Sequence, residues 1–123
     1  MATVLIVEDE AQILSVATLL LTKLGHETIS ACTLAEAQQI IRSDQKLDLV
    51  FTDLGLANHP QGGITVGQLV QECRLGIPVL FTSGRINMGE MNFLFAEPSA
   101  FLRKPYTAQT LSLAVDNLLQ ARH

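Results

Sequence analysis

The sequence predicts an α/β protein of the doubly wound class, in which helices cover both faces of a parallel sheet. Short apolar runs alternate with segments of helical periodicity five times along the chain. The first run, residues 3–7, is apolar throughout after Thr3, as in a strand that is covered on both faces. The chain has 123 residues, of which 48% are hydrophobic and 16% charged, so it can bury a core without disulfides. We therefore expect one domain over residues 1–123.

Turn and capping residues punctuate the expected elements. Gly25 suits the left-handed conformation just past a helix end. Thr33 and Glu36 form a capping-box pattern, and Thr107 can cap the last helix. Strands are expected over residues 3–7, 27–32, 47–53, 78–83 and 99–103. Helices are expected over residues 13–24, 33–42, 65–74 and 87–95, and from Thr107 onward.

Charge, cysteine spacing and hydropathy argue against several kinds of partner and against a membrane location. The net charge of -4 and the scattered Lys and Arg residues argue against direct binding of nucleic acid. Cys32 and Cys73 stand far apart without CxxC spacing, so we expect two free thiols. No apolar run reaches the roughly 18 residues that a membrane span needs, and no signal peptide is apparent. A cytoplasmic protein without membrane contact is expected.

Polar side chains follow four of the five expected strands. Glu8 and Asp9 follow the first, Asp53 ends the third, Ser83 ends the fourth and Lys104 follows the fifth. These side chains should converge, because the carboxyl ends of parallel strands meet at one edge of the sheet. Three crowded carboxylates repel one another unless a cation relieves them, and hard oxygen ligands suit Mg²⁺ or Mn²⁺. We therefore expect a magnesium site at this edge.

The same constellation predicts phosphoryl transfer. A metal, an ammonium and a hydroxyl around one exposed carboxylate can stabilise the charge of a transferring phosphoryl group. Asp53 is the expected nucleophile. Lys104 and the Ser83 hydroxyl would each contact a phosphoryl oxygen.

Four short motifs at the strand ends resemble one family. They are Val-Glu-Asp-Glu at residues 7–10, Thr-Asp at 52–53, Thr-Ser-Gly at 82–84 and Arg-Lys-Pro-Tyr at 103–106. Together they resemble the receiver domain of response regulators in two-component signalling, over essentially the whole chain. The resemblance implies a flavodoxin-like (βα)5 fold, similar to that of chemotaxis regulators, with strand order 2-1-3-4-5. It also implies a phosphoacceptor domain rather than an enzyme.

The resemblance further implies roles for residues at the matching positions. Asp53 corresponds to the phosphoacceptor, Glu8 and Asp9 to the metal-binding acidic pair, and the backbone carbonyl of Gly55 to a further metal ligand. Lys104 matches the family's lysine. In that family a cis peptide bond joins this lysine to the proline that follows it, here Pro105.

Two more positions match the family's conformational switch. Ser83 corresponds to the switch hydroxyl and Phe101 to the switch aromatic. The phosphoryl donor would be a histidine kinase or a histidine phosphotransfer protein. Phosphorylation would change the face formed by the fourth helix, fifth strand and fifth helix. The output would pass to a downstream partner or a covalently linked effector. The cognate kinase, phosphorylation-dependent dimerisation and the length of the native protein stay open.

The loop after Asp53 departs from the family. The usual proline is replaced by Ala57, and the stretch to Gly63 is one or two residues longer, which leaves the lifetime of an acyl phosphate open. Two rival functions are an aspartyl-phosphate phosphohydrolase and a docking module without phosphorylation. Gly55 replaces the second aspartate that such hydrolases carry two residues after the nucleophile. A nucleotide-binding domain is a more distant rival, because the sequence has no G-x-G-x-x-G pattern or P-loop.

Overall fold

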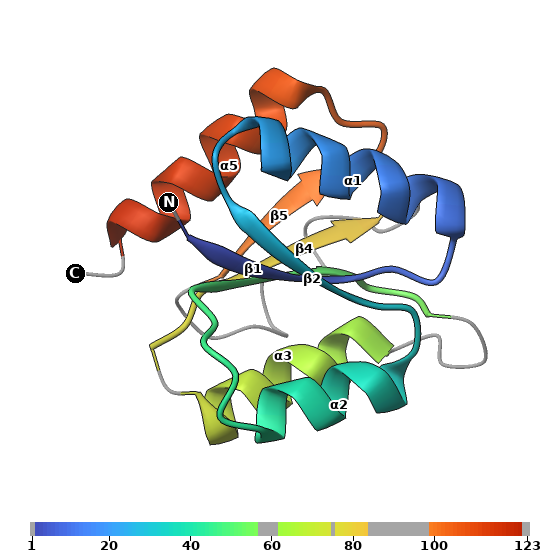
Figure 1. The fold of residues 1–123 in the computed structure, drawn as a ribbon, viewed down its shortest axis with the longest axis vertical. Coiled ribbons are helices and arrows are strands. Elements are labelled where there is room, and N and C mark those ends of the chain that lie inside the picture. The colour runs from blue at the N-terminus through green and yellow to red at the C-terminus, as the bar shows by residue number, and fades with distance from the viewer. Residues whose placement is uncertain (1, 57–61, 75, 84–98, 122–123) are drawn as a thin grey trace.

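The fold is a five-stranded parallel sheet with helices on both faces (Figure 1). The computed structural model describes residues 2–56, 62–74, 76–83 and 99–121. The strand order is β2-β1-β3-β4-β5, so the predicted fold class and order are confirmed. The strands are β1 (Thr3–Val7), β2 (Glu27–Ala31), β3 (Leu49–Asp53), β4 (Val79–Ser83) and β5 (Ser99–Arg103).

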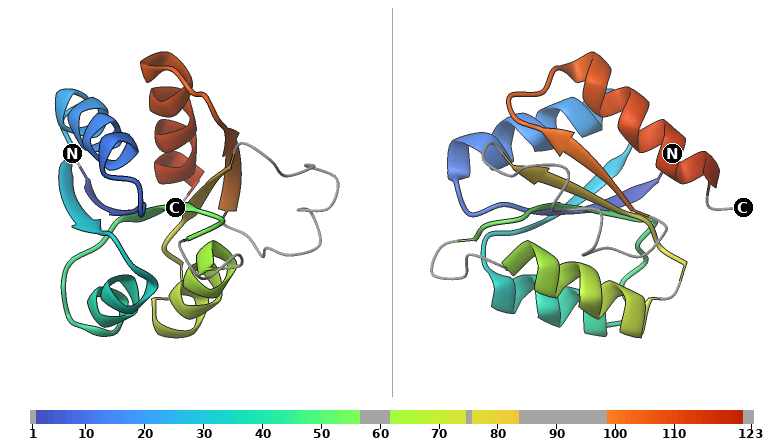
Figure 2. Two further views of the ribbon diagram at one scale, coloured as in Figure 1. Left: turned by 90° about the vertical axis from the view of Figure 1, so that its right-hand side faces the viewer. Right: turned by 180° about the vertical axis from the view of Figure 1, so that it is seen from behind.

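The described helices form two layers, one on each face of the sheet (Figure 2). One layer contains α1 (Ala11–Lys23) and α5 (Ala108–Ala121), and the other contains α2 (Leu34–Arg42) and α3 (Gly62–Cys73). Successive strand residues point to opposite faces. In β1, Val4 and Ile6 pack towards α1 and α5, whereas Leu5 and Val7 pack towards α2 and α3. The helix predicted over residues 87–95 lies outside the described residues, as does Ala57.

Local signals account for several helix ends. Gly25 has φ 94°, the left-handed conformation predicted for it. The Glu36 amide donates to Thr33 Oγ1 over 3.1 Å. The Glu36 carboxylate accepts from the Cys32 amide over 2.7 Å, one residue earlier than a standard capping box would place this bond. Thr107 Oγ1 accepts from the amide of Thr110, three residues later, so the predicted cap is present.

The start of α3 corrects the sequence-based boundary. This helix was predicted over residues 65–74, but it runs from Gly62 to Cys73. Its first two residues, Gly62 and Gly63, fall in the stretch that the sequence assigns to the loop after Asp53. A side chain at Gly63 would overlap the carbonyl oxygen of Asp53, and the Gly63 amide donates to Leu54 O over 2.8 Å. The glycine therefore allows α3 to begin directly against the end of β3.

A third glycine of α3, Gly67, makes a testable contact with the sheet. A methyl group added there would lie 2.6 Å from Cζ of Phe81. We expect Gly67→Ala to lower the free energy of unfolding by about 1–3 kcal/mol through overpacking. In a Phe81→Leu background the same change should cost little or stabilise, because alanine exceeds glycine in helix propensity by about 1 kcal/mol. Urea unfolding of the four proteins measures this coupling. An equal cost in both backgrounds would contradict the contact.

Candidate functional site

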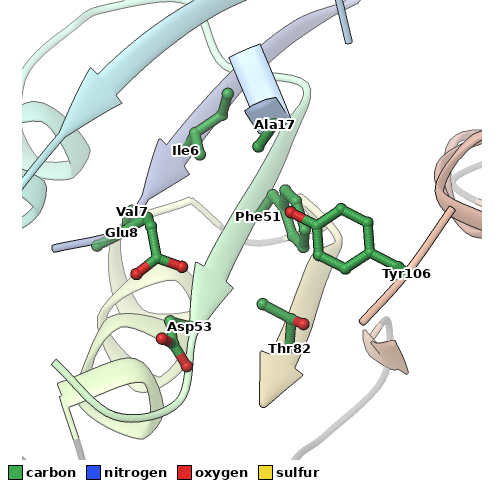
Figure 3. A pocket seen from close by; sticks show the side chains of 8 residues that line it. All are labelled: Ile6, Val7, Glu8, Ala17, Phe51, Asp53, Thr82 and Tyr106. Atoms are coloured by element: carbon green, nitrogen blue, oxygen red, sulfur yellow. The ribbon is translucent and has the colours of Figure 1, made fainter. Parts of the chain in front are cut away.

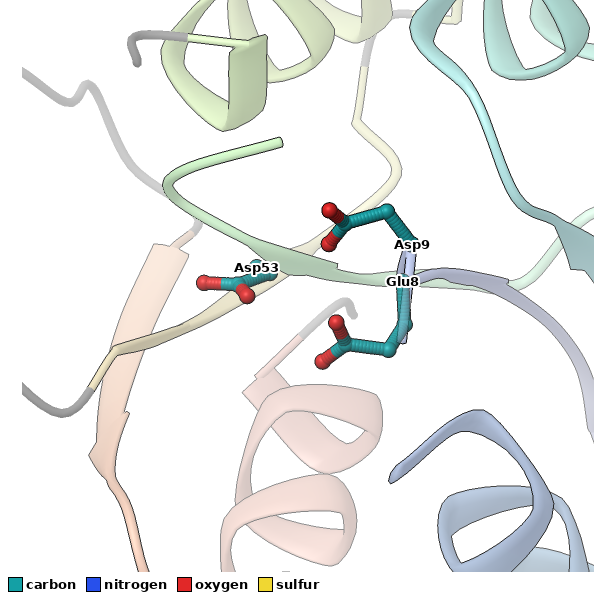
Figure 4. Close-up of side chains that lie close together, drawn as sticks. All are labelled: Glu8, Asp9 and Asp53. Carbon is teal, nitrogen blue, oxygen red and sulfur yellow. The ribbon is translucent and has the colours of Figure 1, made fainter. Parts of the chain in front are cut away.

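Three carboxylates gather where β1 and β3 end (Figure 4). Glu8 and Asp9 follow β1 directly, and Asp53 is the last residue of β3. The two strands are hydrogen-bonded neighbours, with Val7 opposite Thr52, so their ends lie side by side. One oxygen of each carboxylate lies within 4.8 Å of the others. The structure therefore brings together the three acidic residues that the sequence singled out.

Lys104 reaches this group from the end of β5. Its Nζ donates to Glu8 Oε1 and to Asp53 Oδ2, each over 3.0 Å. The exposed fractions of the side chains are 19% for Lys104, 4% for Glu8 and 13% for Asp53, so water screens these ion pairs weakly. One ammonium thus bridges two carboxylates that would otherwise repel each other.

Burial and pairing shift the proton affinities of these groups. Burial raises the pKa of Glu8 above its ordinary value, although the hydrogen bonds from Lys104 and the Glu10 amide oppose this effect. Burial alone would lower the pKa of Lys104. Its hydrogen bonds to Glu8 and Asp53 outweigh that effect, so its pKa is raised. Lys104 therefore keeps its positive charge, whereas burial disfavours the charged form of Glu8.

Backbone contacts hold the acidic side chains and the strand ends in place. The Glu10 amide donates to Glu8 Oε2 over 3.2 Å, and the Gly55 amide donates to Asp53 Oδ1 over 3.4 Å. The amide of Leu54, the residue after β3, donates to Thr82 O over 2.9 Å. These bonds hold the end of β3 against β4, so Asp53 projects from a hydrogen-bonded strand end.

The donor set fits a hard divalent cation. Three carboxylates offer oxygen ligands, which Mg²⁺ and Mn²⁺ prefer, and a cation would relieve the repulsion around the buried Glu8. Among the described residues, Glu8, Asp9 and Asp53 are the carboxylates that can hold it. The role of the Gly55 backbone carbonyl as a further metal ligand stays a prediction.

The two predicted switch residues lie on the neighbouring strands. Ser83 ends β4, is 9% exposed, and accepts a hydrogen bond at its carbonyl oxygen from the Lys104 amide over 3.1 Å. Phe101 lies in the middle of β5, opposite Phe81, and packs half-buried on the side of α2 and α3. The peptide bond from Lys104 to Pro105 is cis, as the resemblance implied. Switching by Ser83 and Phe101 stays a prediction.

A narrow pocket beside the carboxylates was not predicted from the sequence (Figure 3). The Tyr106 ring stands edge-on to Phe51, with centroids 5.7 Å apart and an interplanar angle of 64°. Thr82 is a buried polar residue within an apolar strand, which is the one signal the sequence offered. The pocket is lined by Ile6, Val7, Glu8, Ala17, Phe51, Asp53, Thr82 and Tyr106.

Comparison with known proteins identifies the family. The model of the response regulator receiver domain matches residues 4–116, so the chain belongs to that family. Such domains are typically phosphoacceptors rather than enzymes, and they generally act with a histidine kinase. None of the helices in the described ranges is long and apolar enough to cross a membrane.

Individual relatives agree with this assignment. The chain is 29% identical over 117 residues to the uncharacterized transcriptional regulatory protein YbdJ of Bacillus subtilis, covering 95% of this chain. It spans only 50% of that relative's length. A crystal structure of a receiver protein from Sinorhizobium medicae is 30% identical with a TM-score of 0.91, covering 99% of this chain and 97% of that one. A receiver domain from Clostridium thermocellum is 25% identical with a TM-score of 0.83 and the same coverage.

The environment of Tyr106 can be tested by titration. Burial raises the pKa of Tyr106, and the nearby Lys104 opposes that effect. Tyr106 is the chain's one tyrosine and there is no tryptophan, so near-ultraviolet absorbance follows its ionisation alone. We expect a midpoint above about 10 in the folded chain and an ordinary midpoint near 10 in urea. Circular dichroism would verify that the chain is folded at each pH. Equal midpoints in the two states would contradict a half-buried ring.

Proposed function

We propose that this chain is a phosphorylation-dependent signalling switch. In this proposal Asp53 accepts a phosphoryl group from the phosphohistidine of a histidine kinase or of a histidine phosphotransfer protein. The observation that carries it is the Lys104 ammonium, 3.0 Å from an oxygen of Asp53 and 3.0 Å from one of Glu8. This cation stands where charge would develop during phosphoryl transfer. Membership of the receiver family supports the same reaction.

Asp53 is the proposed nucleophile. One of its oxygens bonds to phosphorus while the phosphorus–nitrogen bond of the donor phosphohistidine breaks. The departing imidazole nitrogen keeps the electron pair of that bond and takes up a proton from water. Lys104 faces the negative charge that spreads over the transferring oxygens, and the Ser83 hydroxyl is the proposed contact for another oxygen.

Mg²⁺ is the proposed cofactor, and Mn²⁺ is a chemically similar substitute. Glu8, Asp9, Asp53 and the carbonyl of Gly55 would hold it. When bound, the ion supplies positive charge that neutralises the crowded carboxylates and the incoming phosphoryl oxygens.

The proposed output is a shift between two pre-existing states. A phosphoryl group on Asp53 draws Ser83 inward, and Phe101, which is half-buried now, gains room to turn inward. The face that changes includes β5 and α5 and the segment predicted as the fourth helix. A downstream protein or a linked effector that prefers the phosphorylated form reads the change.

We propose that residues 1–123 are one receiver domain and that it works in the cytoplasm. The chain spans half the length of the Bacillus subtilis relative, so the proposal covers the receiver domain alone. Direct contact of the domain with nucleic acid or membrane is not part of the proposal.

Two rival functions have weaker support. A phosphohydrolase needs a second acid or base near the nucleophile, and Gly55, two residues after Asp53, has no side chain to supply one. A docking module that has lost phosphorylation would have no need for Lys104 and three carboxylates in contact range. Sustained turnover of a generic phosphate ester would favour the phosphohydrolase.

Phosphorylation of Asp53 can be tested by intact-mass spectrometry. We expect the chain to gain one phosphoryl group from acetyl phosphate in the presence of Mg²⁺, because the Lys104 ammonium already lies beside Asp53. Removal of the metal with a chelator should slow the gain at least tenfold. Asp53→Asn should abolish it.

Asp44→Asn provides a matched control. Asp44 is an exposed carboxylate between α2 and β3, so its replacement should leave the labelling unchanged. Uptake of phosphoryl label by Asp53→Asn at the normal rate would contradict the proposal.

A further inference from the structure

The hydroxyl of Thr82 is buried and has no hydrogen-bond partner. Thr82 is 3% exposed. Within the described ranges, its Oγ1 is the one buried side-chain oxygen or nitrogen that makes no hydrogen bond. Buried polar groups are nearly always paired, so an unpaired hydroxyl is evidence that a partner arrives in another state of the protein.

Thr82 stands next to Asp53. The two residues are opposite each other in the parallel pair of β3 and β4, so their side chains lie on the same face of the sheet. Both line the pocket beside the carboxylates, and Figure 3 places Thr82 between Asp53 and the Tyr106 ring. Neighbouring strands are about 4.8 Å apart, so rotation about the Cα–Cβ bond of Thr82 can bring its hydroxyl within reach of an oxygen added to Asp53.

Other partners for this hydroxyl are poor candidates. The Thr82 hydroxyl oxygen is covered from solvent, so water does not reach it in this conformation. The side chains of Ile6, Ala17 and Phe51, which also line the pocket, are apolar and offer no hydrogen-bond partner. The carboxylate of Asp53 is already engaged by Lys104 and by the Gly55 amide. A phosphoryl group on Asp53 would bring new acceptor oxygens to the side where Thr82 stands.

We propose that Thr82 is a further phosphoryl-binding residue, whose hydroxyl donates a hydrogen bond to an oxygen that Asp53 carries once it is phosphorylated. The inference rests on the proposed function of Asp53. It adds Thr82, on the strand next to β3, to Lys104 as a contact for the phosphoryl group. The unpaired hydroxyl disfavours the unphosphorylated state, and its bond favours the phosphorylated one. Both effects shift the equilibrium between the two states towards the phosphorylated one.

The test uses the stable phosphoryl mimic fluoroberyllate (BeF₃⁻) with Mg²⁺. Its apparent dissociation constant follows from the rise that it causes in the urea midpoint of unfolding. Thr82→Val keeps the shape of the side chain and removes the hydroxyl, whereas Thr82→Ser keeps the hydroxyl. We expect the constant to rise about fivefold or more in Thr82→Val, as for one lost hydrogen bond, and to stay within twofold of wild type in Thr82→Ser.

The same titrations show whether Thr82 is merely structural. Without ligand, Thr82→Val should unfold at an equal or higher urea concentration than wild type, since it removes an unpaired buried hydroxyl. Lower stability of Thr82→Val would mean that the hydroxyl is already paired, and it would overturn the inference. Equal dissociation constants for wild type and Thr82→Val would also overturn it and would leave the proposed function standing. Failure of wild type both to bind the mimic and to take label at Asp53 would refute the proposed function itself, and the inference with it.

Discussion

The bridge from Lys104 to Glu8 and Asp53 is the interaction on which the rest of the site depends. Glu8 is almost fully buried, and its neighbours Asp9 and Asp53 carry the same charge. A carboxylate in that position is unfavourable unless a cation stands beside it. Lys104 lies 96 residues from Glu8 and 51 from Asp53 along the chain. The bridge can therefore form only when β1, β3, β4 and β5 lie side by side in the sheet.

The topology of the sheet brings these distant residues together at one edge. Parallel strands place all their carboxyl ends on the same side, and the order β2-β1-β3-β4-β5 puts β1 and β3 side by side. Backbone bonds beyond the strands extend this alignment, from Leu54 to Thr82 and from Lys104 to Ser83. Gly63 then lets α3 start against the carbonyl of Asp53, where any side chain would displace it. The contacts that pack the fold are thus the same contacts that position the site residues.

The sequence predicted the fold well because its signals are local or periodic. Apolar runs defined the strands, Gly25 and Thr33 marked helix ends, and the acidic residues at strand ends needed only the parallel topology to converge. The start of α3 was wrong, because two glycines that suit a turn also suit a helix packed against backbone, and only tertiary contacts decide between them. The pocket at Thr82 and Tyr106 was missed for the same reason. The roles of Ser83, Phe101 and the Gly55 carbonyl stay predictions.

The most direct test of this bridge is the free energy of unfolding of Lys104→Met at neutral pH without divalent metal. Removal of the ammonium leaves buried carboxylates without their cation, so we expect a loss of about 3 kcal/mol. Mg²⁺ should recover part of that loss, since the donor set fits this ion. Lys46→Met is the matched control, because Lys46 is 76% exposed and its pair with Asp48 should contribute less than about 1 kcal/mol. Equal unfolding free energies for the two variants would contradict the central role of Lys104.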